Sequence, residues 1–425
     1  MSKIKKRLVP VRRFKEFENA DAWEQRKFRD ISKTKRGFTY KPSNIDNTGI
    51  RVLRSSNIKK DTFVISDDDV FVKESAVNIP FVENGDILIT AANGSTNLVG
   101  KHAIIRDIPK NSAVHGGFML ITTSKEYEFL NALMSSNWYK KFIKKYVAGG
   151  NGAIGNLRKN DLDNQKIYVP KKDEQEKIGD FFKQFDSLIA LHQRKLDKLK
   201  RVKSAYLTEM FPAEGEREPK RRFPGFTGAW EQRKFFDNIE KVIDFRGRTP
   251  KKLGMEWSAE GYTALSALNV KDGYIDFTAD VHYANQDLYD KWMVGNDLYK
   301  GQVLFTTEAP MGNVAQVPDN RKYVLSQRTI AFNVDKTKVT NDFLAVLLRS
   351  QNVQHTLKSL ASGGTAQGVS QKSLSQLKVI VPIKPKEQQK IGDFFKQLDS
   401  LIALHQRKLD KLKKMKAAYL NEMFV

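Results

Sequence analysis

One 38-residue stretch occurs twice in this chain, and it constrains the fold more than any other feature. Residues 174–211 and residues 387–424 agree at 32 of 38 positions, and the copies lie 213 residues apart in a chain of 425 residues. This offset is half of the chain and far exceeds the period of solenoid repeats. The duplication therefore involves two whole structural units, each of which ends in the same segment.

Shorter repeats occupy matching places in the two halves. The heptapeptide AWEQRKF begins at Ala22 and at Ala229, and RRF stands before each copy, at Arg12 and Arg221. Within the variable stretches, GDILIT resembles GQVLFT, and AGGNGAIG resembles ASGGTAQG ahead of KIYVP and KVIVP. The halves are thus expected to share a fold while differing in most side chains. A chain that starts like its second half and ends like its first is typical of a closed, pseudo-twofold arrangement.

The repeated segment has the heptad pattern of a coiled-coil helix, with apolar residues at alternating spacings of three and four. In the first copy the predicted seam consists of Phe182, Phe185, Ile189, His192, Leu196 and Leu199, and it continues through Lys203, Tyr206 and Met210. In the second copy it consists of Phe395, Leu398, Ile402, His405, Leu409 and Leu412, and it continues through Lys416, Tyr419 and Met423. A helix of this length rises about 55 Å at ~1.5 Å per residue. Because each copy is the obvious partner of the other, we expect an antiparallel pair that sets a distance between two globules.

The variable stretches mix short β-branched runs with amphipathic ones. DILIT, HAIIRDI, FMLITT, QVLFTT and YVLSQRTIAFNV predict strands, whereas residues 126–147 and 341–360 predict helices. The predicted fold class is α+β, with two pseudo-twofold-related α/β domains separated by two long helices in an antiparallel coiled coil. The predicted divisions are a basic lead (1–21), a first domain (22–170), a central helix (171–212), a linker (213–229), a second domain (230–383) and a C-terminal helix (384–425).

Composition favours a polyanionic partner. The chain has 73 Lys and Arg residues against 49 Asp and Glu residues, a formal net charge of +24, which indicates nucleic acid before anionic membrane. Cysteine is absent, which excludes disulfides and thiolate chemistry and fits a reducing cytoplasm. The sequence contains no run of 18 apolar residues, so no membrane span is predicted. The basic N-terminus is not followed by the apolar segment of a secretory signal.

Catalytic motifs are missing. The segment from Gly94 to Lys101 resembles a phosphate loop, but it has one residue too many between its glycines and has His102 where Ser or Thr must hold magnesium. The six histidines lack metal-ligand spacing, and His192 and His405 are interpreted as polar seam residues that fix register. The triplet 67–69, all Asp, is expected to be a solvated turn. The chain is predicted to bind and not to catalyse.

The repeated segments carry a family resemblance. Val-Pro, then Glu-Gln-x-Lys-Ile, Phe-Phe, Asp-Ser-Leu-Ile, Lys-Leu and Met-Phe, beginning near Glu174 and Glu387, resemble the conserved regions of specificity (S) subunits of type I restriction–modification enzymes. The AWEQRKF segments, the two variable stretches and the length match as well, so the resemblance covers nearly the whole chain.

The resemblance implies that each variable stretch is a target-recognition domain reading one half of a bipartite, asymmetric site in double-stranded DNA. The conserved helices would set the spacer and dock methyltransferase (M) subunits, which use S-adenosylmethionine to methylate adenine. Restriction (R) subunits would add translocation and cleavage driven by ATP with Mg. The chain itself would hold no cofactor or metal and catalyse none of these steps. A coiled-coil adaptor or structural DNA-binding protein without sequence specificity, and a stand-alone nuclease, are the alternatives.

Base-reading residues are expected among Arg, Lys, Asn, Gln, Ser and Thr in loops beside strands. The candidates of the first domain are Lys35, Arg36, Arg54, Ser55, Asn57, Asn93, Ser95, Asn97 and Lys101, and those of the second are Arg246, Arg248, Ser266, Asn269, Thr307, Glu308, Gln327 and Arg328. Gly-rich turns around Asn151 and Gln367 could let backbone amides approach phosphate. A solvated surface residue or turn is the alternative for each of them.

Six apolar residues of the helices lie off the predicted seam. They are Phe181, Leu188, Leu191, Phe394, Leu401 and Leu404. The apolar stripe is therefore wider than one partner helix requires, and we predict that the surplus docks the M subunit. Packing against the globules is the alternative.

Overall fold

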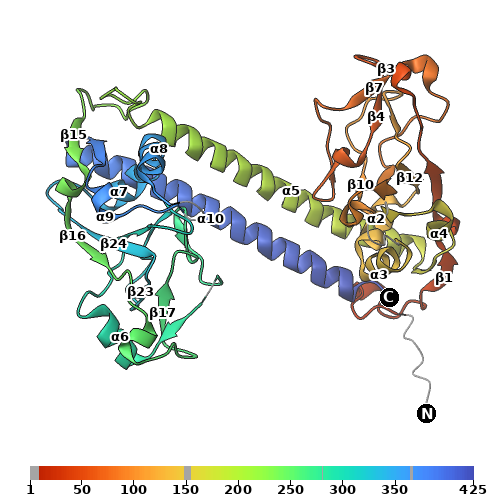
Figure 1. The fold of residues 1–425 in the computed structure, drawn as a ribbon. Coiled ribbons are helices and arrows are strands. Elements are labelled where there is room, and N and C mark those ends of the chain that lie inside the picture. Colours follow the sequence, from red (N-terminus) through yellow and green to blue (C-terminus); the bar gives the residue numbers. More distant parts are fainter. Residues whose placement is uncertain (1–8, 148–154, 280, 364–366) are drawn as a thin grey trace, which may run out of the picture. The chain divides into compact units, whose positions relative to one another are not determined.

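The computed structural model describes residues 9–147, 155–279, 281–363 and 367–425. The chain folds as two compact units, one formed by residues 1–192 with 407–425 and the other by residues 193–406. Each unit combines sheets and short helices with one segment of each long helix, as the α+β prediction requires (Figure 1). None of the helices in the described residues is both long and apolar enough to span a membrane.

The first unit contains an antiparallel sheet of order β10-β8-β12-β2 and a mixed sheet of order β11-β4-β7-β3, with two-stranded pairs β1-β14, β13-β9 and β5-β6. Its strands are β1 (Glu24–Lys27), β2 (Lys33–Arg36), β3 (Ile45–Asp46), β4 (Ile50–Leu53), β5 (Ile58–Lys59), β6 (Thr62–Phe63), β7 (Val70–Val72), β8 (Ile87–Thr90), β9 (Ala92–Asn93), β10 (His102–Ile104), β11 (Ala113–His115), β12 (Met119–Thr123), β13 (Gly155–Asn156) and β14 (Lys166–Val169).

The second unit has the same plan of one antiparallel and one mixed sheet, but its mixed sheet has three strands where that of the first unit has four. Its antiparallel sheet has the order β16-β24-β21-β22, and its mixed sheet has the order β20-β17-β23. Its strands are β15 (Glu231–Lys234), β16 (Ile239–Asp244), β17 (Tyr262–Leu265), β18 (Val270–Lys271), β19 (Tyr274–Ile275), β20 (Tyr283–Ala284), β21 (Val303–Thr306), β22 (Val314–Gln316), β23 (Val324–Leu325), β24 (Thr329–Val334) and β25 (Lys378–Val381). In both units the central strands, β8 and β21, are fully buried.

Both amphipathic runs that predicted a single helix form two helices. The α-helices are α1 (Phe28–Ile31), α2 (Tyr127–Ser135), α3 (Asn137–Tyr146), α4 (Lys159–Asp163), α5 (Lys172–Glu209), α6 (Gln286–Met293), α7 (Asn341–Leu347), α8 (Gln351–Leu360), α9 (Gln371–Leu374) and α10 (Pro385–Glu422). Ser136, with extended backbone, ends α2 and starts α3, whereas α7 ends at Leu347 and the extended Ser350 starts α8. The predicted strand 323–334 is likewise divided, at residues 326–328, into β23 and β24.

Two of the repeated segments in each half form a pair of antiparallel strands. The EQRK part of AWEQRKF forms β1 and pairs antiparallel with β14, the KIYV run, and β15 pairs in the same register with β25, the KVIV run. Each pair joins the start of a unit to the residues that lead into its long helix, α5 or α10. The repeats outside the helices thus form the base on which each recognition domain is built.

A buried ion pair connects this base to the long helix. In the first unit, the Arg13 guanidinium donates to both carboxylate oxygens of Glu174 at 2.7 and 2.6 Å, and the Trp23 indole N–H contacts the same carboxylate at 3.4 Å. The Arg13 and Glu174 side chains are only 6% and 2% exposed. The charge on Glu174 is therefore neutralised where water cannot solvate it.

The second unit contains the same cluster. Arg222 donates to both oxygens of Glu387 at 2.6 and 2.8 Å, and the Trp230 indole N–H lies 3.3 Å from that carboxylate. The RRF, AWEQRKF and Glu-Gln motifs of each half thus meet at one point, which explains why they recur together.

An aromatic residue from the far end of the other long helix completes each core. In the first unit, Phe424, which follows α10, packs against Trp23, Phe129 and Phe182 with ring centroids 5.9–6.0 Å apart. In the second unit, Phe211 packs in the same way against Trp230, Phe343 and Phe395 at 5.9–6.4 Å. Each core therefore includes residues from the beginning of one long helix and from the end of the other.

The segments of the two helices run antiparallel within each unit. Phe181 and Phe185 contact Tyr419, and Asp186 pairs with Lys416 in the first unit. Tyr206 contacts Phe394, and the Lys203 ammonium lies 2.7 Å from the Asp399 carboxylate in the second. The twelve predicted seam residues are buried or half-buried. Lys203 and Lys416, which interrupt the apolar pattern, each form an ion pair with an aspartate of the other long helix.

Glycine permits the recognition domain to approach the helix closely. A Cβ at Gly179 would lie 2.8 Å from the Phe129 backbone nitrogen of α2, and one at Gly392 would lie 2.8 Å from the Asp342 side chain and 3.0 Å from the Phe343 nitrogen of α7. Such distances are shorter than van der Waals contact. The glycine that interrupts each repeated helix near its start is thus required by packing.

We predict that the buried ion pairs stabilise the two units separately. Arg13→Ala leaves the Glu174 carboxylate buried and unpaired, which should lower the free energy of opening the first unit by about 3 kcal/mol. Arg12→Ala is the matched control, because Arg12 pairs with Glu422 at the surface, where the two side chains are 55% and 37% exposed. Hydrogen exchange in β1 and β14, with β15 and β25 as the internal reference, measures the effect. Equal protection of β1 and β14 in both variants would contradict this role.

Candidate nucleic-acid interface

Five of the predicted base-reading residues line one shallow polar hollow in the second unit. They are Arg246, Thr307, Glu308, Gln327 and Arg328, and Gly247, Ser362, Gly368, Val369 and Ser370 complete the lining. The Gly-rich turn that contains Gln367, itself exposed, thus adjoins the predicted readers. Sequence positions more than 100 residues apart are brought to one surface.

Backbone hydrogen bonds hold the walls of this hollow together. The Thr307 N–H, just beyond the end of β21, donates to the Arg328 carbonyl at 2.9 Å, and the Val369 N–H donates to the Thr307 carbonyl at 2.9 Å. Glu308 also forms an antiparallel bridge with Gly368. The side chains around the hollow are therefore presented by fixed backbone, as base reading requires.

The cations of the hollow are balanced by carboxylates at its rim. Arg328 lies 2.8 Å from Glu308, with side chains that are 58% and 41% exposed, and Arg246 pairs with Asp244 at 2.6 Å. The Arg328–Glu308 pair is exposed to solvent, and such pairs contribute little stability, whereas the Asp244 side chain is only 9% exposed. A phosphate or a base edge could therefore replace the Glu308 carboxylate at small cost.

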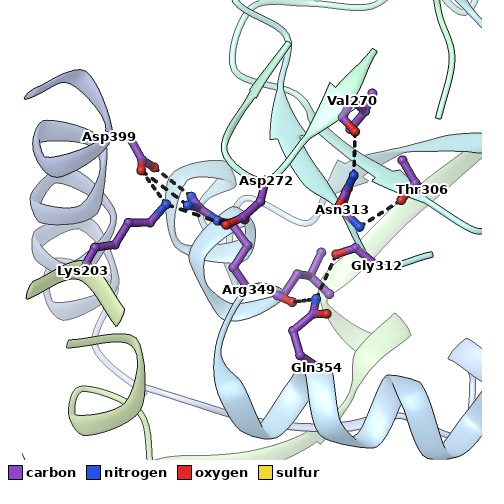
Figure 2. Close-up of polar contacts among 10 residues, drawn as sticks. Lys203, Val270, Asp272, Thr306, Gly312, Asn313, Arg349, Gln354 and Asp399 are labelled. Carbon is purple, nitrogen blue, oxygen red and sulfur yellow. Dashed lines mark hydrogen bonds and ion pairs between the residues drawn. The ribbon is translucent and has the colours of Figure 1, made fainter. Parts of the chain in front are cut away.

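A polar network behind the hollow fixes the loop after β21 (Figure 2). Asn313 donates from its amide to the Val270 carbonyl at 2.9 Å, and its N–H donates to the Thr306 hydroxyl at 2.9 Å. Gln354 donates to the Gly312 carbonyl at 2.9 Å. Both ends of the β21–β22 connection, which carries Thr307 and Glu308, are thus held in place.

The same network continues to the helix segments of the second unit. Arg349 donates to Asp399 of α10 at 2.8 Å and to Asp272 at 2.6 Å, and Lys203 of α5 also contacts Asp399 (Figure 2). Within this unit, the recognition domain is therefore bonded to both helices through one aspartate.

The first unit has an equivalent arrangement at the end of β8. The N–H groups of Ala91 and Ala92 donate to the Phe118 carbonyl at 2.9 and 3.0 Å, and the Leu157 N–H donates to the Ala91 carbonyl at 2.7 Å. The Asn93 amide donates to the Ser55 hydroxyl at 3.2 Å, which joins two predicted readers 38 residues apart.

The remaining candidates of the first unit lie at its surface, except for Arg54. Lys35, Arg36, Ser95, Asn97 and Lys101 are exposed, and the first two belong to β2, which pairs with β12. Arg54 is half-buried, and its guanidinium donates to the Asp68 carbonyl at 3.1 Å. Asn151 lies outside the described residues. These residues remain predicted DNA contacts.

The side chains of two further candidates in the second unit form contacts within that unit. The Arg248 guanidinium donates to the Trp292 carbonyl and lies 4.6 Å from the centre of the Phe245 ring. Ser266 donates its hydroxyl to the Asn269 side chain at 2.8 Å. Arg248 therefore packs on the domain, whereas Arg246, Glu308, Gln327 and Arg328 keep exposed or half-exposed side chains around the hollow. The predicted reader Thr307 requires correction, because it is only 1% exposed and its hydroxyl donates to the Arg328 carbonyl at 3.3 Å.

The two predicted readers Asn57 and Asn269 require correction. Both side chains are fully buried, and each oxygen accepts the N–H of the residue three positions earlier, at 2.7 and 3.0 Å. The Asn57 amide also donates to Asp69, which is buried against Arg51, so the third aspartate of the triplet is not solvated as expected. These asparagines shape equivalent turns and present no surface to DNA.

Buried histidine adds no charge to this surface near neutral pH. His115 on β11 is 2% exposed, and burial lowers the pKa of its imidazole to about 4. Burial likewise lowers the pKa of His102. The positive charge of the first recognition domain therefore comes from Lys and Arg side chains. The described residues contain no group of three His, Asp or Glu side chains placed to hold a metal ion.

A second polar hollow, in the first unit, was missed. Arg29, Ser32, Lys33, Thr34, Lys159, Asn160, Asp163 and Asn164 line it. Lys33 belongs to the same KTKR run as the predicted Lys35 and Arg36, which is the only sequence signal that pointed toward it.

The off-seam residues of the helices fall into two groups. Phe181 packs against Phe14, and Phe394 packs against Phe223, so each phenylalanine is covered within its own unit. The four leucines, Leu188, Leu191, Leu401 and Leu404, are 37–44% exposed. The exposed apolar surface of each helix is thus a pair of leucines near its middle.

Comparison with known proteins identifies the class to which this architecture belongs. The description of the family that matches is "Type I restriction modification DNA specificity domain", and it matches twice, over residues 20–201 and 230–414. The chain belongs to this family and contains two copies of the domain.

Relatives of the same kind match along almost the whole length. The chain is 24% identical over 420 residues to the type I restriction enzyme MjaX specificity subunit of Methanocaldococcus jannaschii, covering 95% of this chain and 93% of that protein. It is 23% identical over 362 residues to the MjaVIII specificity subunit of the same organism, covering 83% and 80%. The crystal structure of a type I S subunit from M. genitalium shares the fold with a TM-score of 0.66 at 13% identity, covering 98% of this chain and 99% of that one.

Proposed function

We propose that the chain is the DNA sequence-recognition subunit of a type I restriction–modification enzyme, in which each unit reads one half of a bipartite, asymmetric site. The observation that carries this proposal is the frame shared by the two units. In both units the chain beyond the central strand bonds to a turn residue, Phe118 or Arg328, and to a later backbone N–H, that of Leu157 or Val369, while the side chains at these places differ. Two readers of one design with different side chains fit an asymmetric target.

The enzymatic steps belong to other subunits in this proposal. Methyltransferase subunits with S-adenosylmethionine would modify the DNA, and restriction subunits with ATP and Mg would translocate and cleave it, in the cytoplasm. The chain contributes binding through Lys, Arg and polar side chains. A coiled-coil adaptor without sequence specificity is not favoured, because both recognition domains match a DNA specificity family.

Exchange of one recognition domain tests the proposal. Residues 22–170 are replaced by the same region of a relative, and each protein is expressed with its M partner before the genomic DNA is sequenced for methylated adenine. We expect one half-site to change and the other to remain, because each unit has its own core and its own reading surface. Exchange of residues 230–383 is the matched control and should change the opposite half-site. If both half-sites changed in each exchange, the two-reader proposal would be wrong.

We also propose that the exposed leucines near the middle of the helices dock the M subunits. Leu188 and Leu401 are 44% and 43% exposed and occupy the same position of the duplicated helix. Clustered exposed apolar side chains on a helix are typical of protein contacts.

Leu188→Lys and Leu401→Lys should each weaken assembly with M by at least tenfold, because a charge would be buried in an apolar interface. Lys195→Ala is the matched control, since Lys195 is an exposed residue of the same helix. Co-purification and titration with M measure the effect, and melting temperatures report folding. Undiminished assembly of both lysine variants would refute the docking role.

A further inference from the structure

One tight turn is built in the same way in both recognition domains. In the first unit it comprises residues 116–119, where the Met119 N–H donates to the Gly116 carbonyl at 2.8 Å. In the second it comprises residues 326–329, where the Thr329 N–H donates to the Ser326 carbonyl at 3.2 Å. Each turn connects the strand that lies parallel in the mixed sheet, β11 or β23, to the central antiparallel sheet.

The backbone of the two turns is anchored at equivalent points. The first residue of each turn, Gly116 or Ser326, donates its N–H to the last residue of the neighbouring strand, Leu53 at 2.8 Å or Leu265 at 3.0 Å. The third residue accepts from the chain just beyond the buried central strand, as described above for Phe118 and Arg328. Phe118 therefore occupies in the first domain the place that Arg328 occupies in the second.

The side chains at the tip differ in chemistry. The second domain presents Gln327 and Arg328, whose amide and guanidinium match the acceptors and donors on purine edges. The first domain presents Gly117 and Phe118, and the Phe118 ring is 70% exposed. A phenylalanine is usually buried in a folded protein, and glycine at position 117 leaves no neighbouring side chain on the tip to shield the ring.

The surroundings of Phe118 favour DNA over an apolar protein surface. Lys35 and Arg36 are exposed on β2, and Arg36 is paired with Leu120, two residues beyond Phe118 on the adjacent strand. The polar pair of Asn93 and Ser55 lies past the end of β8, to which the Phe118 carbonyl is bonded. The adjacent strand and the chain beyond β8 thus contribute cations and amides, which suit a surface that meets phosphates and base edges.

We propose that Phe118 reads a thymine in the first half-site by contact with its C5-methyl group, in the place where Arg328 reads a base of the second half-site. Thymine alone among the bases carries an apolar group in the major groove, and phenylalanine is among the side chains that contact it. This inference rests on the proposed function and adds a specificity-determining residue that polar-residue reasoning excluded.

The test removes the methyl group and the ring separately. The wild-type S–M complex is titrated with its own methylation site, and each thymine of the first half-site is replaced in turn by deoxyuridine. We expect one position at which deoxyuridine weakens binding by about fourfold, the effect of one buried methyl group. In Phe118→Ala that position should lose its preference for thymine, and Phe118→Leu should retain part of it. Tyr274→Ala, which removes an exposed aromatic residue of the second unit, is the matched control and should leave the preference intact.

The other outcomes are distinguishable. If the wild-type complex showed no preference for any DNA sequence, the proposed function itself would fail. If it bound its site specifically but Phe118→Ala kept the thymine preference, the assignment of Phe118 would be wrong. A uniform loss of binding to thymine and deoxyuridine sites would show a wedge between bases, and weakened assembly with M would show a protein contact; either result would also overturn the assignment.

Discussion

A buried carboxylate at the start of each long helix is the contact on which the rest of the molecule depends. Glu174 and Glu387 each bind an arginine and a tryptophan that come from more than 150 residues earlier in the chain. The same tryptophan faces the phenylalanine that ends the other helix, Phe424 or Phe211. The first residues of each long helix therefore pack in the core of one unit, and its last residues pack in the core of the other unit. A change in either helix therefore affects a core in both units.

The contacts shared by the two units leave the surfaces that are proposed to read DNA free to differ. The helix bases, the β1-β14 and β15-β25 pairs and the buried central strands are common to both units, and they fix the backbone of the loops. Substitutions at the tips of those loops, such as Phe118 against Arg328, leave the shared hydrogen bonds in place because these are made by the backbone. The backbone frame is therefore shared, and the side chains proposed to read DNA can change without altering its hydrogen bonds.

The sequence alone predicted the parts of this design that depend on repetition and periodicity. The duplication predicted two related units, and the heptads predicted the buried helix faces. Five of the predicted readers line one hollow, but their contact with DNA stays a prediction. Local patterns could not predict where Ser136 and Ser350 break the helices, because the amphipathic period continues across each break. Nor could they separate a buried turn-forming amide, as in Asn57, from an exposed one. The exposure of Phe118 was not predicted either, because an aromatic residue beside a strand is ordinarily assigned to the core.

The central proposal is that the length of the duplicated helices sets the number of unspecified base pairs between the two half-sites. Insertion of one heptad after Lys200 and another after Lys413 tests it most directly, because each helix then lengthens by about 10 Å at ~1.5 Å per residue while the apolar stripe keeps its phase. Duplex DNA rises roughly 3.4 Å per base pair, and bending or twisting can absorb part of the added length. The methylated motif of the variant, expressed with its M partner, should keep both half-sites and gain about one to three unspecified base pairs between them. An active variant with an unchanged gap, or with altered half-sites, would contradict the account.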